Sequence, residues 1–110
     1  MAEVVFATSI VRGKEDLERE TRDKMAGAGR EEYVAALKDV GITRQAIWHQ
    51  QMPDGGTLAI IYNEATDSDA LERLISSYAS RWFVQQVQEA YGRWISHPPL
   101  PVELVHDIRI

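Results

Sequence analysis

Two polar side chains inside strand-like segments are the strongest candidates for chemistry in this chain. His49 lies in the segment 43–52 and Tyr62 in the segment 57–64. An imidazole can act as a general base near neutral pH, and a phenol can donate a hydrogen bond. We therefore take His49 and Tyr62 as candidate catalytic residues. The alternative is a core or interface role with satisfied hydrogen bonds, because the sequence fixes no second catalytic group around His49.

Aromatic and cationic side chains indicate where a small molecule could bind. The tryptophans at positions 48, 82 and 94 could line a pocket for a flat ligand, or they could fill the core and anchor an interface. An arginine could hold an anionic group of the ligand, or it could be a solvated surface side chain. The candidate ligand-binding residues are Trp48, Trp82, Arg81, Arg44 and Tyr33.

The residue content excludes several kinds of catalytic and cofactor site. The chain has no cysteine, which excludes disulfides, thiolate catalysis, cysteine-ligated zinc and iron–sulfur clusters. His97 and His106 have no metal-ligand spacing around them, and the chain has no glycine-rich phosphate loop and no Gly-x-Ser-x-Gly turn. We expect no metal and no cofactor. A haem site is an alternative, with His49, His97 or His106 as the axial ligand.

Length and charge indicate one acidic domain that covers residues 1–110. The formal net charge of -5 does not attract nucleic acid or an anionic membrane. The segment 58–61 is aliphatic where an RNA-recognition domain carries stacking aromatic rings. The first residues lack the pattern of a signal peptide, and no apolar run approaches the roughly 20 residues that span a bilayer. We expect a cytoplasmic protein without nucleic-acid or membrane partners.

The first part of the chain predicts a strand and then an interrupted helix. Val4–Val11 is a β-branched run that is apolar on both sides. Glu15–Met25 has the charge density of a solvated surface helix with a narrow buried stripe. Glycines within Ala26–Gly29 interrupt this helix. It resumes at Arg30 and ends before Gly41, where glycine can take the left-handed conformation.

A hairpin is the clearest local signal. Strand-like runs at 43–52 and 57–64 flank Pro53-Asp54-Gly55-Gly56, a sequence that favours a turn. An even-length loop would set His49 opposite Ile60 and on the same face as Tyr62, with Trp48 on the other face. An odd-length loop would exchange these groupings.

The last part of the chain predicts a second interrupted helix and a final strand. After N-cap candidates at 66–67, apolar residues keep helical spacing to Gly92, with a break indicated at Ser76-Ser77. Arg93–Pro101 is a proline-rich loop, and Val102–Ile110 alternates like a strand. The order is a ferredoxin-like β-α-β-β-α-β fold of the α+β class, with a four-stranded antiparallel sheet. Two helical regions cover one sheet face, so we expect a second copy of the chain to cover the other in a homodimer.

Three stretches that together span most of the chain carry a family resemblance. They are Arg30-Glu31-Glu32-Tyr33 with Leu37, then Gly41-Ile42-Thr43-Arg44 leading to Trp48, then Arg81-Trp82-Phe83 with Gln86-Val87. With the Pro-Asp-Gly turn they resemble the dimeric α/β-barrel superfamily, which includes antibiotic-biosynthesis monooxygenases, EthD-like proteins and stress-responsive barrel proteins. Within it they are most similar to an uncharacterised bacterial family. The resemblance implies a homodimeric α/β barrel and implies no particular activity.

These observations predict a homodimer that binds a small apolar or aromatic molecule between its sheet and its helices. By analogy of fold, one alternative is a cofactor-independent monooxygenase or isomerase, in which His49, Tyr62 and Trp82 supply polar groups to a dry pocket. The remaining alternatives are a haem-binding protein and a purely structural dimerisation module.

Overall fold

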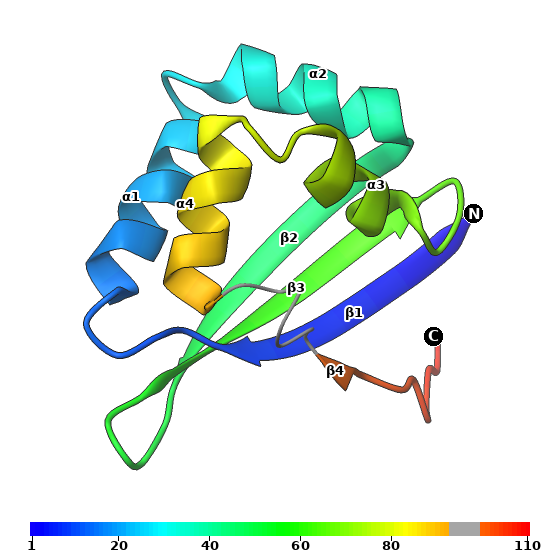
Figure 1. Cartoon of the computed structure of the whole chain (residues 1–110). Coiled ribbons are helices and arrows are strands. Elements are labelled where there is room, and N and C mark those ends of the chain that lie inside the picture. The colour runs from blue at the N-terminus through cyan, green and yellow to red at the C-terminus, as the bar shows by residue number, and fades with distance from the viewer. Residues whose placement is uncertain (93–99) are drawn as a thin grey trace.

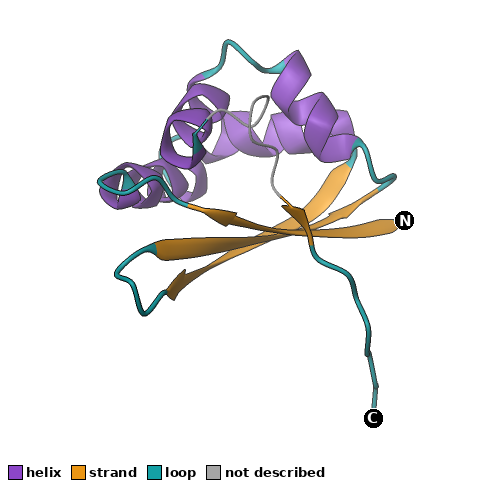
Figure 2. Ribbon diagram, turned by 60° about the horizontal axis from the view of Figure 1, so that its bottom comes forward, coloured by secondary structure: helices purple, strands orange, loops and turns teal. Residues whose placement is uncertain are grey.

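The computed structural model describes residues 1–92 and 100–110 and shows an antiparallel sheet with helices on one of its faces (Figure 1). In chain order the elements are β1 (Ala2–Ser9), α1 (Glu15–Ala26), α2 (Arg30–Val40), β2 (Ile42–Gln51), β3 (Thr57–Ala65), α3 (Ala70–Ser77), α4 (Trp82–Tyr91) and β4 (Leu100–Pro101). The central strand is β3, with β2 on one side and β1 on the other. The second face of the sheet carries no helix (Figure 2).

The α+β class is confirmed, but the ferredoxin-like fold with a four-stranded sheet, and the dimeric α/β barrel built from it, is wrong. The sheet has three full strands in the order β2-β3-β1. On the side of β1 that faces away from β3, the two residues of Leu100–Pro101 form a short strand opposite Phe6 and Ala7. The predicted strand Val102–Ile110 makes one backbone hydrogen bond, from Val102 N–H to the Val5 carbonyl at 2.9 Å, and then leaves the sheet. Alternation shows that a segment could form a strand, but it does not supply the pairing edge. Most of the loop predicted at Arg93–Pro101, namely residues 93–99, is outside the described residues.

Both helical regions are divided into two helices, so four helices cover the sheet in place of two. The glycines at 27 and 29 separate α1 from α2, and a side chain at Gly29 would meet the Trp82 ring, because a Cβ built there lies 2.4 Å from the ring. At the end of α2, Gly41 has a φ of 90° and its N–H donates to the Leu37 carbonyl. The left-handed C-terminal glycine expected at this position is therefore confirmed.

The hairpin is confirmed, and its loop is odd in length. Gln51 pairs with Thr57, so residues 52–56 form the loop. His49 consequently stands opposite Ala59, and Trp48 stands opposite Ile60. The register expected for an even loop is wrong. The observed register places His49 on the face that the helices cover and Trp48 on the open face.

The core lies between the sheet and the helices. Phe83 of α4 and Ile61 of β3 are each 1% exposed, and the Phe83 ring makes edge contacts with Tyr33 and Trp82. One prediction about this layer is wrong: the charged run of α1 is not solvated throughout, because Glu18 is buried. The narrow buried stripe, expected at Leu17, Thr21 and Met25, is confirmed at Thr21 and Met25. Within the ranges 1–92 and 100–110, no helix is both long and apolar enough to cross a membrane.

Candidate functional site

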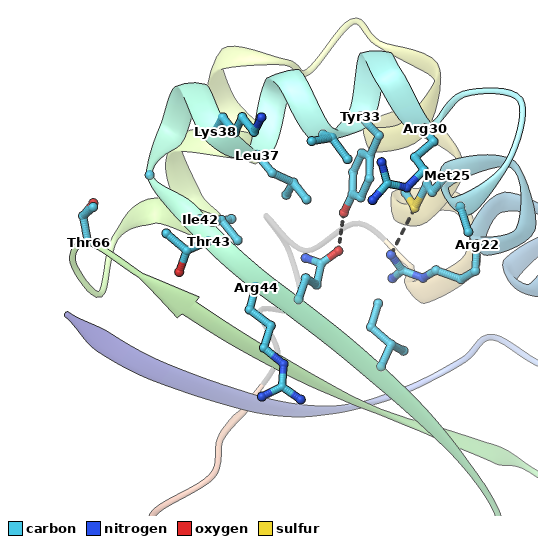
Figure 3. A pocket seen from close by; sticks show the side chains of 15 residues that line it. Arg22, Met25, Arg30, Tyr33, Leu37, Lys38, Ile42, Thr43, Arg44 and Thr66 are labelled. Carbon is cyan, nitrogen blue, oxygen red and sulfur yellow. Dashed lines mark hydrogen bonds between the residues drawn. The ribbon is translucent and has the colours of Figure 1, made fainter.

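A groove runs along the edge of the sheet, between α2 and β2. Its volume is about 840 Å³, within the size range of small-molecule sites. Its apolar lining includes Met25, Val34, Leu37, Ile42 and Ile47. Arg30, Tyr33 and Leu37 extend from α2 toward β2 (Figure 3). The groove exists because β2 is an edge strand, so no further strand occupies the space beneath α2.

Two arginines supply positive charge to this groove. Arg30 begins α2 and is exposed, and in the part of the chain that the structure describes it makes no ion pair. Arg22 of α1 is mostly buried, with a side chain that is 18% exposed, and it is paired with Glu18. Arg30 is therefore available to an anionic ligand group, as is Lys38, which also lines the groove without an ion pair among the described residues, whereas Arg22 is already engaged.

A chain of polar side chains crosses the covered face of the sheet at the inner wall of the groove. Tyr33 donates a hydrogen bond to Gln45 Oε1, and Gln45 Nε2 donates to Asn63 Oδ1 at 2.9 Å. Burial raises the pKa of the Tyr33 phenol above its usual value, so it stays a neutral donor. This chain fixes the Tyr33 ring in the groove through a hydrogen-bonded support on β2 and β3.

A buried carboxylate joins α1 to α4 and β2. Glu18 Oε1 accepts hydrogen bonds from Arg22 Nε at 2.6 Å and from the Tyr91 hydroxyl at 2.5 Å. The other oxygen, Oε2, lies 2.5 Å from His49 Nε2. Arg22 also donates to the Tyr91 hydroxyl at 3.0 Å, which closes a ring of contacts. Glu18 is only 1% exposed, so Arg22 and Tyr91 replace water at Oε1, whereas Oε2 accepts no hydrogen bond and has only the contact with His49.

The partners of Glu18 keep it ionised. Burial raises the pKa of its carboxyl, but Arg22, the hydrogen bond from Tyr91 and the nearby His49 together outweigh burial and hold the pKa below its usual value. The pKa of Tyr91 is raised in turn, first by burial and also by the carboxylate that accepts its hydrogen bond, although Arg22 opposes this. The network therefore contains an ionised carboxylate and a neutral phenol around neutral pH.

A smaller recess continues the groove past α1. Its volume is about 460 Å³, and Arg19, Arg22, Asp23, Ile47 and His49 line it. The recess adjoins the groove, because Arg22 and Ile47 line both. The His49 side chain is 19% exposed, so one side of its ring faces buried Glu18 while the ring still reaches solvent. His49 therefore lines a recess that has two lining residues in common with the groove.

The two candidate catalytic residues lie on opposite faces of the sheet. His49 pairs with Ala59 on the covered face, whereas Tyr62 pairs with Ala46 on the open face. The Tyr62 hydroxyl donates to Glu64 at 3.0 Å. The structure therefore does not bring His49 and Tyr62 into one site.

The candidate ligand-binding residues are also divided among several places. Tyr33 lines the groove. Arg44 borders the groove by its backbone position, but its side chain points away from α2 in Figure 3, stacks on Tyr62 and pairs with Glu64 at 3.2 Å. Trp48 is on the open face and is 54% exposed.

Trp82 and Arg81 join helices and do not line the groove. Trp82 Nε1 donates to Glu32 at 3.0 Å, Arg81 pairs with the same carboxylate, and Lys24 lies 4.1 Å from the centre of the Trp82 ring. These contacts hold α1, α2 and α4 together. Trp94 and His97 are outside the described residues, and His106 lies in the exposed C-terminal segment.

Sequence reasoning missed Glu18, Arg22, Arg30 and Gln45. A usable signal existed for Glu18, because positions 18, 21 and 25 repeat at helical spacing and form the buried stripe of α1. The spacing predicted a stripe through Leu17, one position away. No comparable signal marks Arg30 or Gln45, whose role depends on α2 lying across the edge of β2.

Across the described residues, no group of three or more histidine, cysteine, aspartate or glutamate side chains is arranged to hold a metal ion. Comparison of the chain with models of protein families, with curated proteins and with solved structures finds no match. The superfamily resemblance of the sequence therefore stays a prediction.

Proposed function

We propose that the protein binds a small molecule with an apolar or aromatic body and an anionic group in the groove between α2 and β2. One observation carries this proposal: an apolar groove of about 840 Å³ has at its edge a cation, Arg30, that has no ion-pair partner among the described residues. Apolar walls with few polar groups are typical of small-molecule sites. The cytoplasm, expected from the sequence, is part of the proposal.

The chemistry of the groove defines the ligand. Leu37, Ile42 and Ile47 offer apolar surface, and the Tyr33 ring offers an aromatic wall. A carboxylate on the ligand would meet Arg30, which can donate two parallel hydrogen bonds. A neutral ligand of the same shape would keep the apolar contacts and lose this charge-assisted pair.

Binding of phenylpyruvate, which has a phenyl ring and a carboxylate, tests the proposal. Isothermal titration calorimetry should detect binding, and phenylacetone, which lacks the carboxylate, should bind about tenfold more weakly. Replacing Arg30 with glutamine should weaken the binding of phenylpyruvate by a similar factor and leave the binding of phenylacetone unchanged. Arg12→Gln is the matched control, because Arg12 pairs with Asp54 at the hairpin, away from the groove lining. Equal binding of the two compounds would contradict the role of Arg30, and no binding of either would contradict the proposal.

We infer second that the open face of the sheet pairs with the same face of another copy. Val5, Ala7, Leu58, Ile60 and Tyr62 stand on this face, and they are only half-buried in a single chain. Trp48 extends the same apolar surface toward β2. An apolar patch of this kind is typical of an interaction site.

Charges at one end of the open face favour a second copy over an unrelated partner. Arg44, Glu64 and Glu3 lie there, one cation beside two carboxylates. In a two-fold pair each surface meets itself, and Arg44 of one copy can lie opposite a carboxylate of the other. The apolar centre and mixed-charge rim have the composition of a protein interface.

The mass of the particle in solution tests this pairing. Light scattering after gel filtration should give a dimer, and Ile60→Asp should give a monomer because a carboxylate would then be buried between the copies. Ser76→Asp, an exposed position on α3, is the matched control and should stay a dimer. A wild-type monomer at all concentrations would contradict the pairing without affecting the groove proposal.

A further inference from the structure

We propose that Glu18 and His49 form an acid–base pair that moves a proton on the molecule bound in the groove, and that the substrates are carboxylates with an enolisable carbonyl group. This inference rests on the binding proposed above and adds a reaction to it. The geometry that carries it is the 2.5 Å contact between Glu18 Oε2 and His49 Nε2, at the wall of a recess that continues the groove.

The contact decides which ring nitrogen is available. Glu18 is an ionised carboxylate and can only accept a proton donor, so its contact with His49 Nε2, which lacks hydrogen-bond geometry in this structure, favours the proton on that nitrogen. In the neutral imidazole the lone pair is then on Nδ1. Among the residues that the structure describes, none donates a hydrogen bond to Nδ1. The ring is therefore oriented by a buried carboxylate and keeps a free basic nitrogen, which is the arrangement of a general base with its orienting partner.

Glu18 is a positioning residue and is itself held in place from two sides. Arg22 Nε and the Tyr91 hydroxyl occupy its other oxygen, at 2.6 and 2.5 Å, so the carboxylate cannot rotate away from His49 without losing both hydrogen bonds. A group held in this way has a fixed geometry before substrate arrives. His49, the partner of Glu18, also lines the recess, which shares Arg22 and Ile47 with the groove.

The charges around His49 suit a reaction through an enolate. Arg19, Arg22 and Asp23 of α1 line the recess with it, and Glu18 of α1 and Tyr91 of α4 complete the set of titratable groups nearby. Arg22 uses Nε, Nη1 and Nη2 once each, for Glu18, Met25 and Tyr91. Arg19 and Arg22 still place positive charge at the recess, which can stabilise a negative oxygen there.

The proposed step balances without a further reactant. The bond between the substrate carbon next to the carbonyl and its hydrogen breaks, and the proton moves to His49 Nδ1. The electron pair left on carbon moves into the carbonyl group and produces an enolate oxygen, which Arg22 stabilises. His49 then returns the proton to oxygen or to carbon, so the net reaction is a tautomerisation or an isomerisation. No electron is gained or lost.

Hydrogen exchange in phenylpyruvate tests this step with the same probe as the binding experiment. In deuterated buffer the methylene signal of phenylpyruvate should disappear, by proton NMR, faster with the protein than with buffer alone. His49→Gln can keep a hydrogen bond to Glu18 but has no basic nitrogen, so it should bind phenylpyruvate normally and lose about a hundredfold or more of the exchange rate. Arg12→Gln should exchange like the wild type.

Glu18→Gln tests the positioning role separately. It should lower the exchange rate and shift its pH profile, because a neutral amide cannot stabilise the imidazolium that forms during the reaction. If this variant fails to fold, the His49→Gln result decides the proposal alone. Normal binding without catalysed exchange, or exchange that survives His49→Gln, overturns the acid–base pair and leaves the binding function intact. Absence of phenylpyruvate binding overturns both.

Discussion

Both faces of the sheet carry apolar side chains, but they differ in burial and in where their polar groups lie. The face covered by helices presents Gln45, His49 and Asn63 among its apolar residues, and the buried carboxylate of Glu18 reaches it from α1. The open face has Ile60 at its centre, bordered by half-buried apolar and aromatic side chains of the neighbouring strands. The covered face thus buries polar groups within an apolar core, whereas the open face leaves its apolar side chains partly exposed, with charged groups at one end.

This difference between the two faces corresponds to two kinds of function. Buried polar groups need partners at fixed distances, and Glu18 receives hydrogen bonds from α1 and α4 and a close contact from His49 of β2. An exposed apolar surface needs only a complementary surface and tolerates variation in detail. We therefore expect substitutions on the covered face to change specific chemistry and stability, and substitutions on the open face to change assembly.

The largest effect should follow from removal of the buried carboxylate. Glu18→Leu leaves Arg22 without its charge partner and Tyr91 and His49 without their acceptor. The expected loss in free energy of unfolding is about 3–5 kcal/mol, measured by urea denaturation. Glu20→Gln, on the exposed side of the same helix, should change it by less than about 0.5 kcal/mol. A loss below about 1 kcal/mol for Glu18→Leu would show that the network contributes little.

Two adjacent isoleucines of β3 compare the faces directly. Ile61 is 1% exposed under the helices, and Ile61→Ala should cost about 2–5 kcal/mol at every protein concentration. Ile60 faces the open side, and Ile60→Ala should lower the unfolding temperature mainly by weakening the dimer, so its effect should depend on protein concentration. Calorimetry over a range of concentrations distinguishes the two. Parallel behaviour of both variants would contradict the pairing of the open faces.

Acid should weaken the covered face by protonating Glu18. The pKa of Glu18 is lower in the folded chain than its usual value of 4.5, so the folded state favours the ionised form. The resulting stabilisation is complete above about pH 4.5 and is lost as the pH falls through the folded pKa. Urea denaturation between neutral and acid pH should show this decrease, and Glu18→Gln should show a flatter curve. The same slope in both proteins would assign acid sensitivity to other carboxylates.

The smallest effect is expected at the rim of the open face. The Arg44 side chain is 64% exposed and pairs with Glu64 at 3.2 Å, an arrangement that is largely screened by water and salt. Arg44→Gln should change the free energy of unfolding by at most about 1 kcal/mol. Dimer dissociation should become less sensitive to salt. Unchanged salt dependence would remove Arg44 from the proposed interface.

Local sequence signals predicted most of the helices and strands, but they did not predict which distant segments pair. Gly41 and the Pro-Asp-Gly turn are properties of a few adjacent residues, and both were confirmed. The strand predicted at Val102–Ile110 has the right alternation, but pairing depends on a free edge beside β1, which the pattern does not contain. The face of His49 depended on one residue of loop length, which shifts a whole strand from one face to the other.

The candidate site was only partly predictable for the same reason. His49 was selected for its residue type, and the structure places it beside a recess next to a buried carboxylate. Tyr62 was selected with it but lies on the other face. Glu18 lies in a run of charged residues, so its residue type does not distinguish it from its solvated neighbours. Its burial depends on the packing of α4 and β2 against α1.

The contact between Glu18 and Tyr91 joins residues 73 positions apart along the chain. A partner so distant cannot be reached by local helix formation, because the entropy of closing the intervening chain has to be overcome first. We expect α1 and the hairpin to form early and the Glu18 network to be completed after the folding transition state. Replacing Tyr91 with phenylalanine should then accelerate unfolding and leave the refolding rate nearly unchanged. The network would thus set how long each molecule stays folded.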